Sequence, residues 1–149
     1  MAFIGEYTAK LDDKGRVVFP AAFKSVAAGE GDLRFVVRKD IFADCLEMYS
    51  YPEWERQSEA VRSKLNFFNK EHATFWREYM RNRALVEPDP KLGRIGIPAK
   101  LLEQIGVTKE VVFSGNDYKI EIWAKEKYEL SAISNEDYVA IADKLSHEG

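Results

Sequence analysis

Residues 10–21 read KLDDKGRVVFPA, and residues 88–99 read PDPKLGRIGIPA. Glycine, arginine, proline and alanine recur at one fixed spacing, since Arg94 follows Arg16 by 78 residues. Between the arginine and the proline, both stretches carry apolar residues at alternate positions. Such internal repetition is typical of two copies of one small structural unit. Any contact made by the Gly-Arg turn is therefore present twice in the chain.

The repetition extends beyond these stretches with a shorter spacing of 74 residues in the later part. A tighter turn between the last two predicted strands explains the difference. A repeat that keeps its register and shortens only in a loop indicates that both copies share a fold. The matched residues are Leu46, Glu47, Met48, Tyr49 and Trp54 in the first copy and Ile120, Glu121, Ile122, Trp123 and Tyr128 in the second.

The repeated stretch predicts a turn between two strands. Asp12 can accept hydrogen bonds from backbone N–H groups, and Gly15 can adopt the positive φ that a tight turn needs. We expect residues 6–11 and 16–19 to pair as a β-hairpin around this turn. The second copy predicts strands at 85–87 and 94–97 around a turn at 89–93.

Other elements follow from caps and periodicity. Pro20 and Pro98 can each begin a short helix, because a helix leaves its first N–H groups unpaired. Asn69 is a predicted N-cap of a helical insert, and Ser134 caps a tail helix. Further strands are predicted at 33–38, 45–49, 110–114 and 118–123, a further helix at 53–65, an apolar stripe on the insert at Phe75, Trp76, Tyr79 and Met80, and one on the tail at Tyr138, Ile141, Ala142 and Leu145.

Composition excludes several classes of protein. The 149 residues carry a net charge of −3, so binding to nucleic acid needs a local basic patch against an unfavourable mean field. The single cysteine, Cys45, excludes an internal disulfide and fits a reducing cytosol, where we expect it to be a buried apolar residue. We expect no signal peptide, because residues 1–6 show no basic head followed by an apolar core. We expect no membrane-spanning segment, because no apolar run approaches the roughly 20 residues required.

The sequence predicts no enzyme, no cofactor and no metal site. It contains no phosphate-binding glycine loop and no nucleophile elbow. His72 and His147 each lack a second ligand at metal-binding spacing. Asp12 and Asp13 are adjacent carboxylates, but adjacent side chains point apart and are better explained by turn formation.

The Asp-x-x-x-Arg turn, with Lys14-Gly15-Arg16 followed by apolar residues and Pro20, resembles the MraZ family of bacterial transcriptional regulators. Two such units around a helical insert resemble that family from Phe3 to about Tyr128, whereas one unit alone would indicate only the wider AbrB-like class. The resemblance includes the segment Tyr51-Pro52-Glu53-Trp54-Glu55 and the strand Lys119-Ile120-Glu121-Ile122-Trp123.

The resemblance implies an α+β, mostly β fold, in which two AbrB-like swapped-hairpin units form one interlaced barrel with pseudo-twofold symmetry. The expected segments are a first unit at 1–57, a helical insert at 58–82, a second unit at 83–130 and a helical tail at 131–149. The resemblance also implies a homo-oligomer, expected to be a ring, that is cytoplasmic and associated with the nucleoid. Its partner would be double-stranded promoter DNA containing direct repeats, and its target the operon for division and cell-wall synthesis, which we expect it to repress.

A two-stranded ribbon fits the major groove, so the two turns are the expected DNA-binding elements. Gly15 and Gly93 permit close approach to the duplex. The remaining expected roles are base or phosphate contacts from Arg16 and Arg94, phosphate contacts from Lys14 and Lys91, and orientation of the turns by Asp12 and Asp89.

The second copy departs from the motif, because Pro90 stands four residues before Arg94 and the acid, Asp89, comes one residue earlier. Proline also removes an N–H from the turn. We therefore expect the second turn to be shaped differently and to contribute less to recognition. An alternative function is an antitoxin-like protein-interaction module of the AbrB class, although the helical pattern of residues 131–149 differs from the disordered tail usual in antitoxins.

Overall fold

The computed structural model describes residues 2–148, which form eight strands and six helices of an α+β fold. Six strands make one antiparallel sheet in the order β1-β7-β8-β4-β3-β5, and β2 pairs with β6 in a separate two-stranded sheet. The strands of the larger sheet are β1 (Glu6–Lys10), β3 (Phe35–Lys39), β4 (Leu46–Ser50), β5 (Ala84–Val86), β7 (Glu110–Asn116) and β8 (Lys119–Ala124).

The strand order reflects the sequence repeat. Replacing each strand by its counterpart in the other copy, β1 by β5, β3 by β7 and β4 by β8, gives the same order read backwards. The first strand of each copy pairs with a strand of the other copy, because β1 lies along β7 and β5 lies along β3. The two copies therefore complete one another's sheet, and β4 and β8 join at its centre.

The predicted hairpin between residues 6–11 and 16–19 is wrong in its pairing. β1 forms five residue pairs with β7, whereas β2 (Arg16–Val18) pairs with β6 (Arg94–Gly96). This pairing places Val17 opposite Ile95, and both side chains are almost completely buried. Periodicity in a sequence identifies strands. It does not identify the partner of a strand, which here is the strand whose apolar side chain is buried together with Val17.

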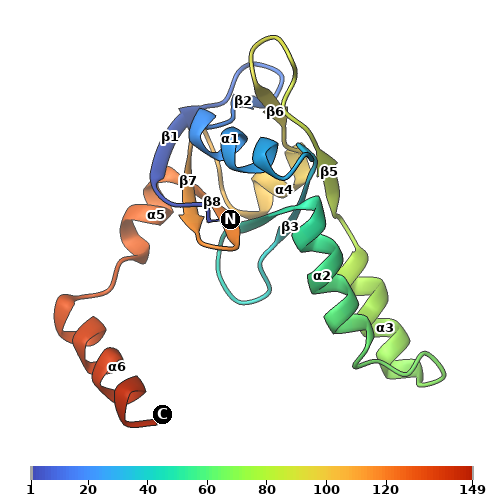
Figure 1. Cartoon of the computed structure of the whole chain (residues 1–149). Helices are drawn as coiled ribbons and strands as arrows, with labels where there is room; N and C mark the ends of the chain where they lie inside the picture. The colour runs from blue at the N-terminus through green and yellow to red at the C-terminus, as the bar shows by residue number, and fades with distance from the viewer. Residues whose placement is uncertain (1, 149) are drawn as a thin grey trace.

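The larger sheet is open, with β1 and β5 at its edges, so the closed interlaced barrel is not confirmed. Its main core lies on one face, where Phe35, Val37 and Met48 point. Helices α1 (Ala21–Gly29) and α4 (Ala99–Gln104) contribute to this core, and each follows the proline predicted to begin it. Figure 1 shows both helices beside the β2–β6 pair, at the end of the molecule where the two chain turns project.

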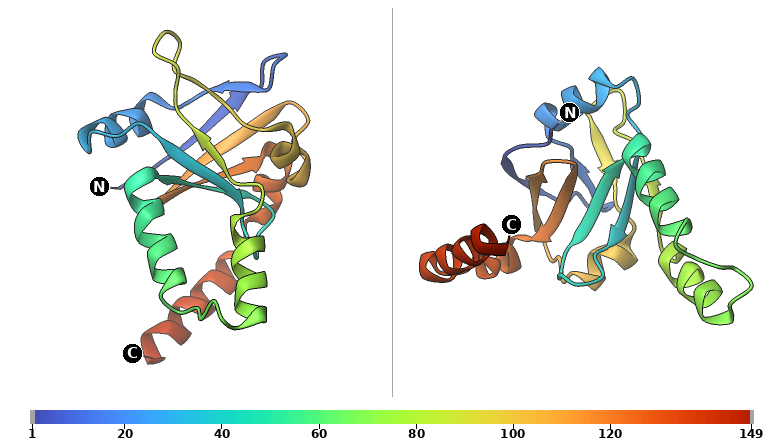
Figure 2. Two further views of the ribbon diagram at one scale, coloured as in Figure 1. Left: turned by 90° about the vertical axis from the view of Figure 1, so that its right-hand side faces the viewer. Right: turned by 60° about the horizontal axis from the view of Figure 1, so that its bottom comes forward.

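The opposite face of β3 and β4 is covered by two helices. Side chains alternate across a strand, so Val36 and Tyr49 point away from the main core and pack with Trp54 and Tyr79. Trp54 belongs to α2 (Tyr51–Arg62) and Tyr79 to α3 (Lys70–Met80). Asn69 caps α3 as predicted, because its side chain accepts hydrogen bonds from the N–H groups of residues 71 and 72. Figure 2 shows the α2–α3 pair extending from the sheet on the side away from the two turns.

The chain ends in α5 (Lys125–Ser131) and α6 (Asn135–Glu148). Ser134 caps α6 as predicted, since its Oγ accepts a hydrogen bond of 3.1 Å from the N–H of Asp137. α6 contains no buried residue. Among residues 2–148, none of the helices combines the length and apolar character needed to cross a membrane.

Candidate nucleic-acid interface

The first turn, residues 12–16, is organised by one carboxylate. Oδ1 of Asp12 accepts hydrogen bonds from the backbone N–H groups of Lys14 at 2.9 Å and Arg16 at 2.8 Å. Oδ2 accepts a third, of 2.8 Å, from Nε of Arg16. Gly15 has a φ of +75°, a conformation that glycine adopts at little cost. The carboxylate therefore fixes both the backbone and the direction of the arginine.

The second turn, residues 89–94, repeats this organisation with one additional residue. Asp89 accepts backbone hydrogen bonds from Lys91, Leu92 and Arg94, and its Oδ2 lies 3.3 Å from Nε of Arg94. Gly93 has a φ of +68°. The second turn is thus shaped differently, as expected, but Asp89 makes the same kinds of hydrogen bond as the acid of the first turn. Pro90 has no backbone N–H to donate, but the first turn does not use this position either. The residue that follows Asp12, Asp13, donates no hydrogen bond to it, and the donors are Lys14 and Arg16.

The two turns lie side by side. β2 and β6 run antiparallel, so Arg16 lies opposite Gly96 and Arg94 lies opposite Val18. Nη1 of Arg94 is 3.8 Å from Oδ2 of Asp12, which links the second arginine to the first turn. Figures 1 and 2 show both turns projecting from the same end of the molecule, with no helix above them. We refer to residues 12–16 and 89–94 together as the basic turns.

The guanidinium of Arg16 is held at one end and free at the other. Neither Nη atom of Arg16 donates a hydrogen bond to any residue in 2–148, because only Nε is engaged by Asp12. About a third of each side chain of this pair is exposed. A guanidinium held at Nε presents its two Nη groups as a fork, which suits phosphate oxygens or the O6 and N7 atoms of guanine.

The carboxylates of the basic turns have lowered pKa values. Hydrogen bonds from the backbone N–H of Arg16, followed by that of Lys14, lower the pKa of Asp12. Hydrogen bonds from the backbone N–H of Leu92 and then of Arg94 hold the pKa of Asp89 well below its usual range. At neutral pH both acids are therefore ionised and only accept hydrogen bonds, and the arginines are the donors.

A groove runs beside the second turn and contains a residue that sequence reasoning missed. It has a volume of about 470 Å³, and Lys24 of α1 and Lys91 both line it. Leu92 at its margin is 61% exposed. No spacing in the sequence connects Lys24 with the second turn, because the two come together only when β2 pairs with β6.

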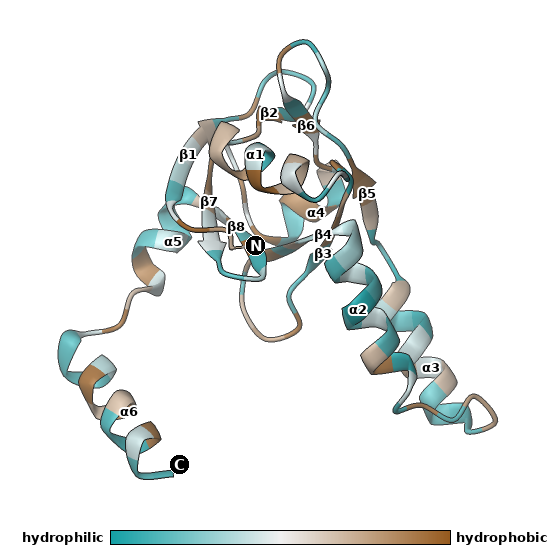
Figure 3. Cartoon of the chain, in the orientation of Figure 1, coloured by the Kyte–Doolittle hydropathy of each residue, from teal (hydrophilic) through white to brown (hydrophobic). Residues whose placement is uncertain are grey.

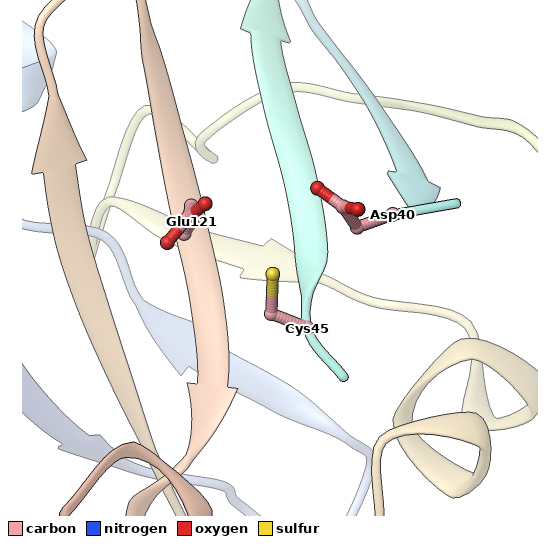
Figure 4. A group of neighbouring side chains, drawn as sticks. All are labelled: Asp40, Cys45 and Glu121. Atoms are coloured by element: carbon pink, nitrogen blue, oxygen red, sulfur yellow. The ribbon is translucent and has the colours of Figure 1, made fainter. Parts of the chain in front are cut away.

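A second group of chemically active side chains lies far from the basic turns. Asp40, Cys45 and Glu121 place one potential ligand atom each within 4.8 Å of one another. Figure 4 shows the three side chains. Nζ of Lys119 lies 3.9 Å from both carboxylates and 2.6 Å from Glu47, so an ammonium already offsets part of their negative charge. Burial and the nearby acids raise the pKa of the Cys45 thiol to about 12, whereas metals bind the thiolate. The group is better explained as a structural ion network, and Cys45 is buried as expected.

Comparison with known proteins places these turns in a defined family. The MraZ protein family model, whose description likens the family to antitoxins, matches residues 2–78 and 80–143. The chain belongs to the MraZ family. Each matched stretch contains one basic turn, so the organisation around Asp12 and Asp89 occurs once in each of the two stretches that match MraZ.

Individual MraZ relatives are similar along nearly the whole chain. A protein of Bacteroides thetaiotaomicron is 35% identical over 98% of this chain and 93% of its own length, and one of Lachnoclostridium phytofermentans is 38% identical over 99% and 97%. A third, from Acetivibrio thermocellus, is 37% identical over 99% of both chains. All three are named transcriptional regulator MraZ, so this chain is similar to transcription regulators.

Proposed function

We propose that this chain is a sequence-specific DNA-binding regulator whose two basic turns contact the major groove. The observation that supports it most strongly is the arrangement of Arg16 and Arg94. Each is held at Nε by an aspartate of its own turn, and the two turns lie side by side at one uncovered end of the molecule.

The proposed contacts divide into two kinds. The Nη forks of Arg16 and Arg94 bind guanine edges or phosphates, while Lys14 and Lys91 bind phosphates. Gly15 and Gly93 leave the turns without a side chain at the point of closest approach. Asp12 and Asp89 orient the arginines and do not touch DNA themselves.

We further propose a cytoplasmic, nucleoid-associated homo-oligomer, in ring form, that represses the operon for division and cell-wall synthesis through direct repeats in its promoter. One consideration supports an oligomer. The net charge of −3 makes each contact weak, and several linked contacts add avidity without adding new chemistry.

The proposal predicts that affinity depends on the number of DNA repeats. Fluorescence anisotropy should use labelled DNA from the region upstream of the gene that encodes this chain. Specific binding should weaken by roughly 10²–10⁴-fold when several repeats in this DNA are reduced to one. A fragment of equal length with scrambled repeats is the control for non-specific attraction, and salt concentration is kept fixed. Equal affinity for one and several repeats would refute multivalent binding, and equal affinity for scrambled DNA would refute specificity.

The antitoxin-like alternative keeps one supporting observation, the uncovered helix α6, which is free to contact another protein. In the DNA-binding proposal the basic turns make the DNA contacts, whereas in the antitoxin-like alternative α6 contacts a partner protein. Deleting residues 132–148 should leave binding to a single DNA repeat intact if the basic turns carry recognition.

A further inference from the structure

The second basic turn carries an apolar side chain that the first turn lacks. Residues 12–16 read DDKGR, whereas residues 89–94 read DPKLGR, so Leu92 is the additional residue of the longer turn. Its side chain is 61% exposed, at the end of the molecule where no helix covers the turns. Figure 3 shows both turns as largely hydrophilic, with a hydrophobic stretch in the longer one. The insertion therefore places a leucine on a surface otherwise made of charged residues, glycine and one proline.

The backbone on both sides of this leucine is fixed. The N–H of Leu92 donates a hydrogen bond of 2.7 Å to Oδ1 of Asp89. The N–H of Gly93 donates one of 3.0 Å to the carbonyl oxygen of Asp89. The carbonyl oxygen of Gly93 accepts one of 2.9 Å from the N–H of Phe19, a buried residue of the other copy. Because the turn is already ordered, a ligand that contacts Leu92 does not have to order it on binding.

Leu92 shares a groove with two other partly exposed apolar side chains. Val18 is 57% exposed and Tyr7 is 39% exposed, and both line the groove beside the second turn. Exposed apolar residues that stand alone are common on protein surfaces and need no explanation. Here three of them meet in one groove of about 470 Å³. A ligand that removes this apolar surface from water gains free energy on binding.

The charges of the groove indicate the kind of ligand. Lys24 of α1 and Lys91 line it, and no acidic side chain is among the residues of 2–148 that do so. An apolar groove whose charges are all positive fits a polyanion that also carries apolar groups. Duplex DNA is such a ligand, because its phosphates are negative and each thymine presents a methyl group in the major groove.

The spacing of Leu92 and Arg94 fits contacts to neighbouring base pairs. The two residues are two positions apart, so their Cα atoms are separated by at most about 7 Å. Base pairs follow one another at about 3.4 Å in B-form DNA. When Arg94 reaches a base edge, Leu92 is therefore within roughly two base pairs of it. An apolar contact in the major groove selects thymine, because thymine alone carries a methyl group there.

We propose that Leu92 contacts the C5-methyl group of a thymine in the DNA repeat, and that Lys24 binds a phosphate beside it. This inference rests on the proposed function and deepens it, because it assigns to the second turn a base that no side chain of the first turn is suited to read. The second turn then has a specificity of its own, in addition to the arginine that it shares with the first.

The test replaces thymine with uracil, which removes only the methyl group and leaves every hydrogen-bonding atom in place. Each thymine position is replaced in turn, in all repeats of the promoter fragment at once. Affinity is measured by fluorescence anisotropy at one salt concentration. At one position the affinity of the wild type should fall at least about fourfold, the value of burying one methyl-sized group. The positions whose methyl group is not contacted are the internal control.

The protein variants identify the side chain that contacts this methyl group. Leu92→Ala should bind the thymine fragment at least about fourfold more weakly, and should no longer distinguish thymine from uracil at the sensitive position. Leu92→Met keeps an apolar side chain of similar volume and should keep the distinction. A purely structural role of Leu92 would lower the affinity for both fragments and leave their ratio unchanged.

The matched control for the leucine is Leu85→Ala. Leu85 on β5 is also 61% exposed, but it does not line the groove, so its truncation should leave both affinity and the thymine preference unchanged. Circular dichroism and sedimentation velocity establish that each variant folds and assembles like the wild type.

Lys24→Ala should lower the affinity for the thymine and uracil fragments by the same factor, because phosphate contacts carry no base information. It should also make the slope of log affinity against log salt shallower by about 1. Lys70→Ala is the control, because Lys70 is an exposed lysine at the start of α3, on the helix pair that extends away from the turns. Unchanged affinity and salt dependence in Lys24→Ala would refute the phosphate contact.

The thymine contact and the proposed function fail in different ways. If no uracil replacement weakens specific binding by the wild type, or if the sensitivity to uracil survives in Leu92→Ala, the thymine contact is wrong and the proposed function stands. If the wild type binds promoter DNA no more tightly than scrambled DNA, the proposed function is wrong, and the thymine contact is wrong with it.

Discussion

Replacing Arg16 with alanine is expected to weaken binding to promoter DNA at least about tenfold, and by more than replacing Arg94. A well-placed arginine contact to a base contributes about 1–3 kcal/mol, which corresponds to roughly 5- to 150-fold in affinity. Both Nη groups of Arg16 are free of hydrogen bonds within residues 2–148, whereas Nη1 of Arg94 also lies 3.8 Å from Asp12. Arg94 is also the less exposed side chain, at 27% against 35%.

The measurement is fluorescence anisotropy of a promoter fragment with each single variant at one salt concentration. Arg62→Ala is the matched control, because Arg62 is an exposed arginine on α2 whose partner is Glu59, away from the basic turns. Equal losses for Arg16→Ala and Arg94→Ala would show that the longer second turn contacts DNA as well as the first. An effect of Arg62→Ala as large as either would mean that only general charge matters.

Phe19→Ala is expected to destabilise the fold by about 3–5 kcal/mol, the usual cost of truncating a buried phenylalanine. The Phe19 ring is 2% exposed and contacts the rings of Phe35 and Phe113, at 5.1 and 5.8 Å between centres. These rings come from both copies of the repeat, so the cavity would open where the copies meet. Since small domains are stable by only about 5–15 kcal/mol, this loss is a large part of the total.

Urea denaturation followed by circular dichroism measures this effect at a fixed protein concentration. Phe68→Ala is the control, because Phe68 is fully exposed and the same truncation there should change stability by less than about 0.5 kcal/mol. A loss below about 1 kcal/mol for Phe19→Ala would contradict a core shared between the copies.

The elements that sequence predicts well are those decided by local chemistry. Asn69 and Ser134 cap their helices as predicted, and both prolines precede short helices, because a cap depends on a few adjacent residues. The acids of the basic turns were also identifiable, since Asp12 and Asp89 bond to N–H groups within five residues.

The features that sequence did not predict depend on contacts between distant segments. The partner of β2 is 78 residues away in the other copy, so the contact of Arg94 with Asp12 could not be deduced from spacing. Arg83 offers no local signal either. Its burial follows from the stacking of Trp54 and Tyr79, which belong to two different helices.

The central claim is that the basic turns carry DNA binding, and the double variant Arg16→Ala with Arg94→Ala tests it most directly. Its affinity for the promoter fragment should be measured by anisotropy across a salt series, beside the wild type and Arg62→Ala. We expect the double variant to lose specific binding, and the slope of log affinity against log salt to become shallower, because cationic contacts to DNA are removed. A double variant that is folded and assembled like the wild type, and binds with unchanged affinity and salt dependence, would contradict the account.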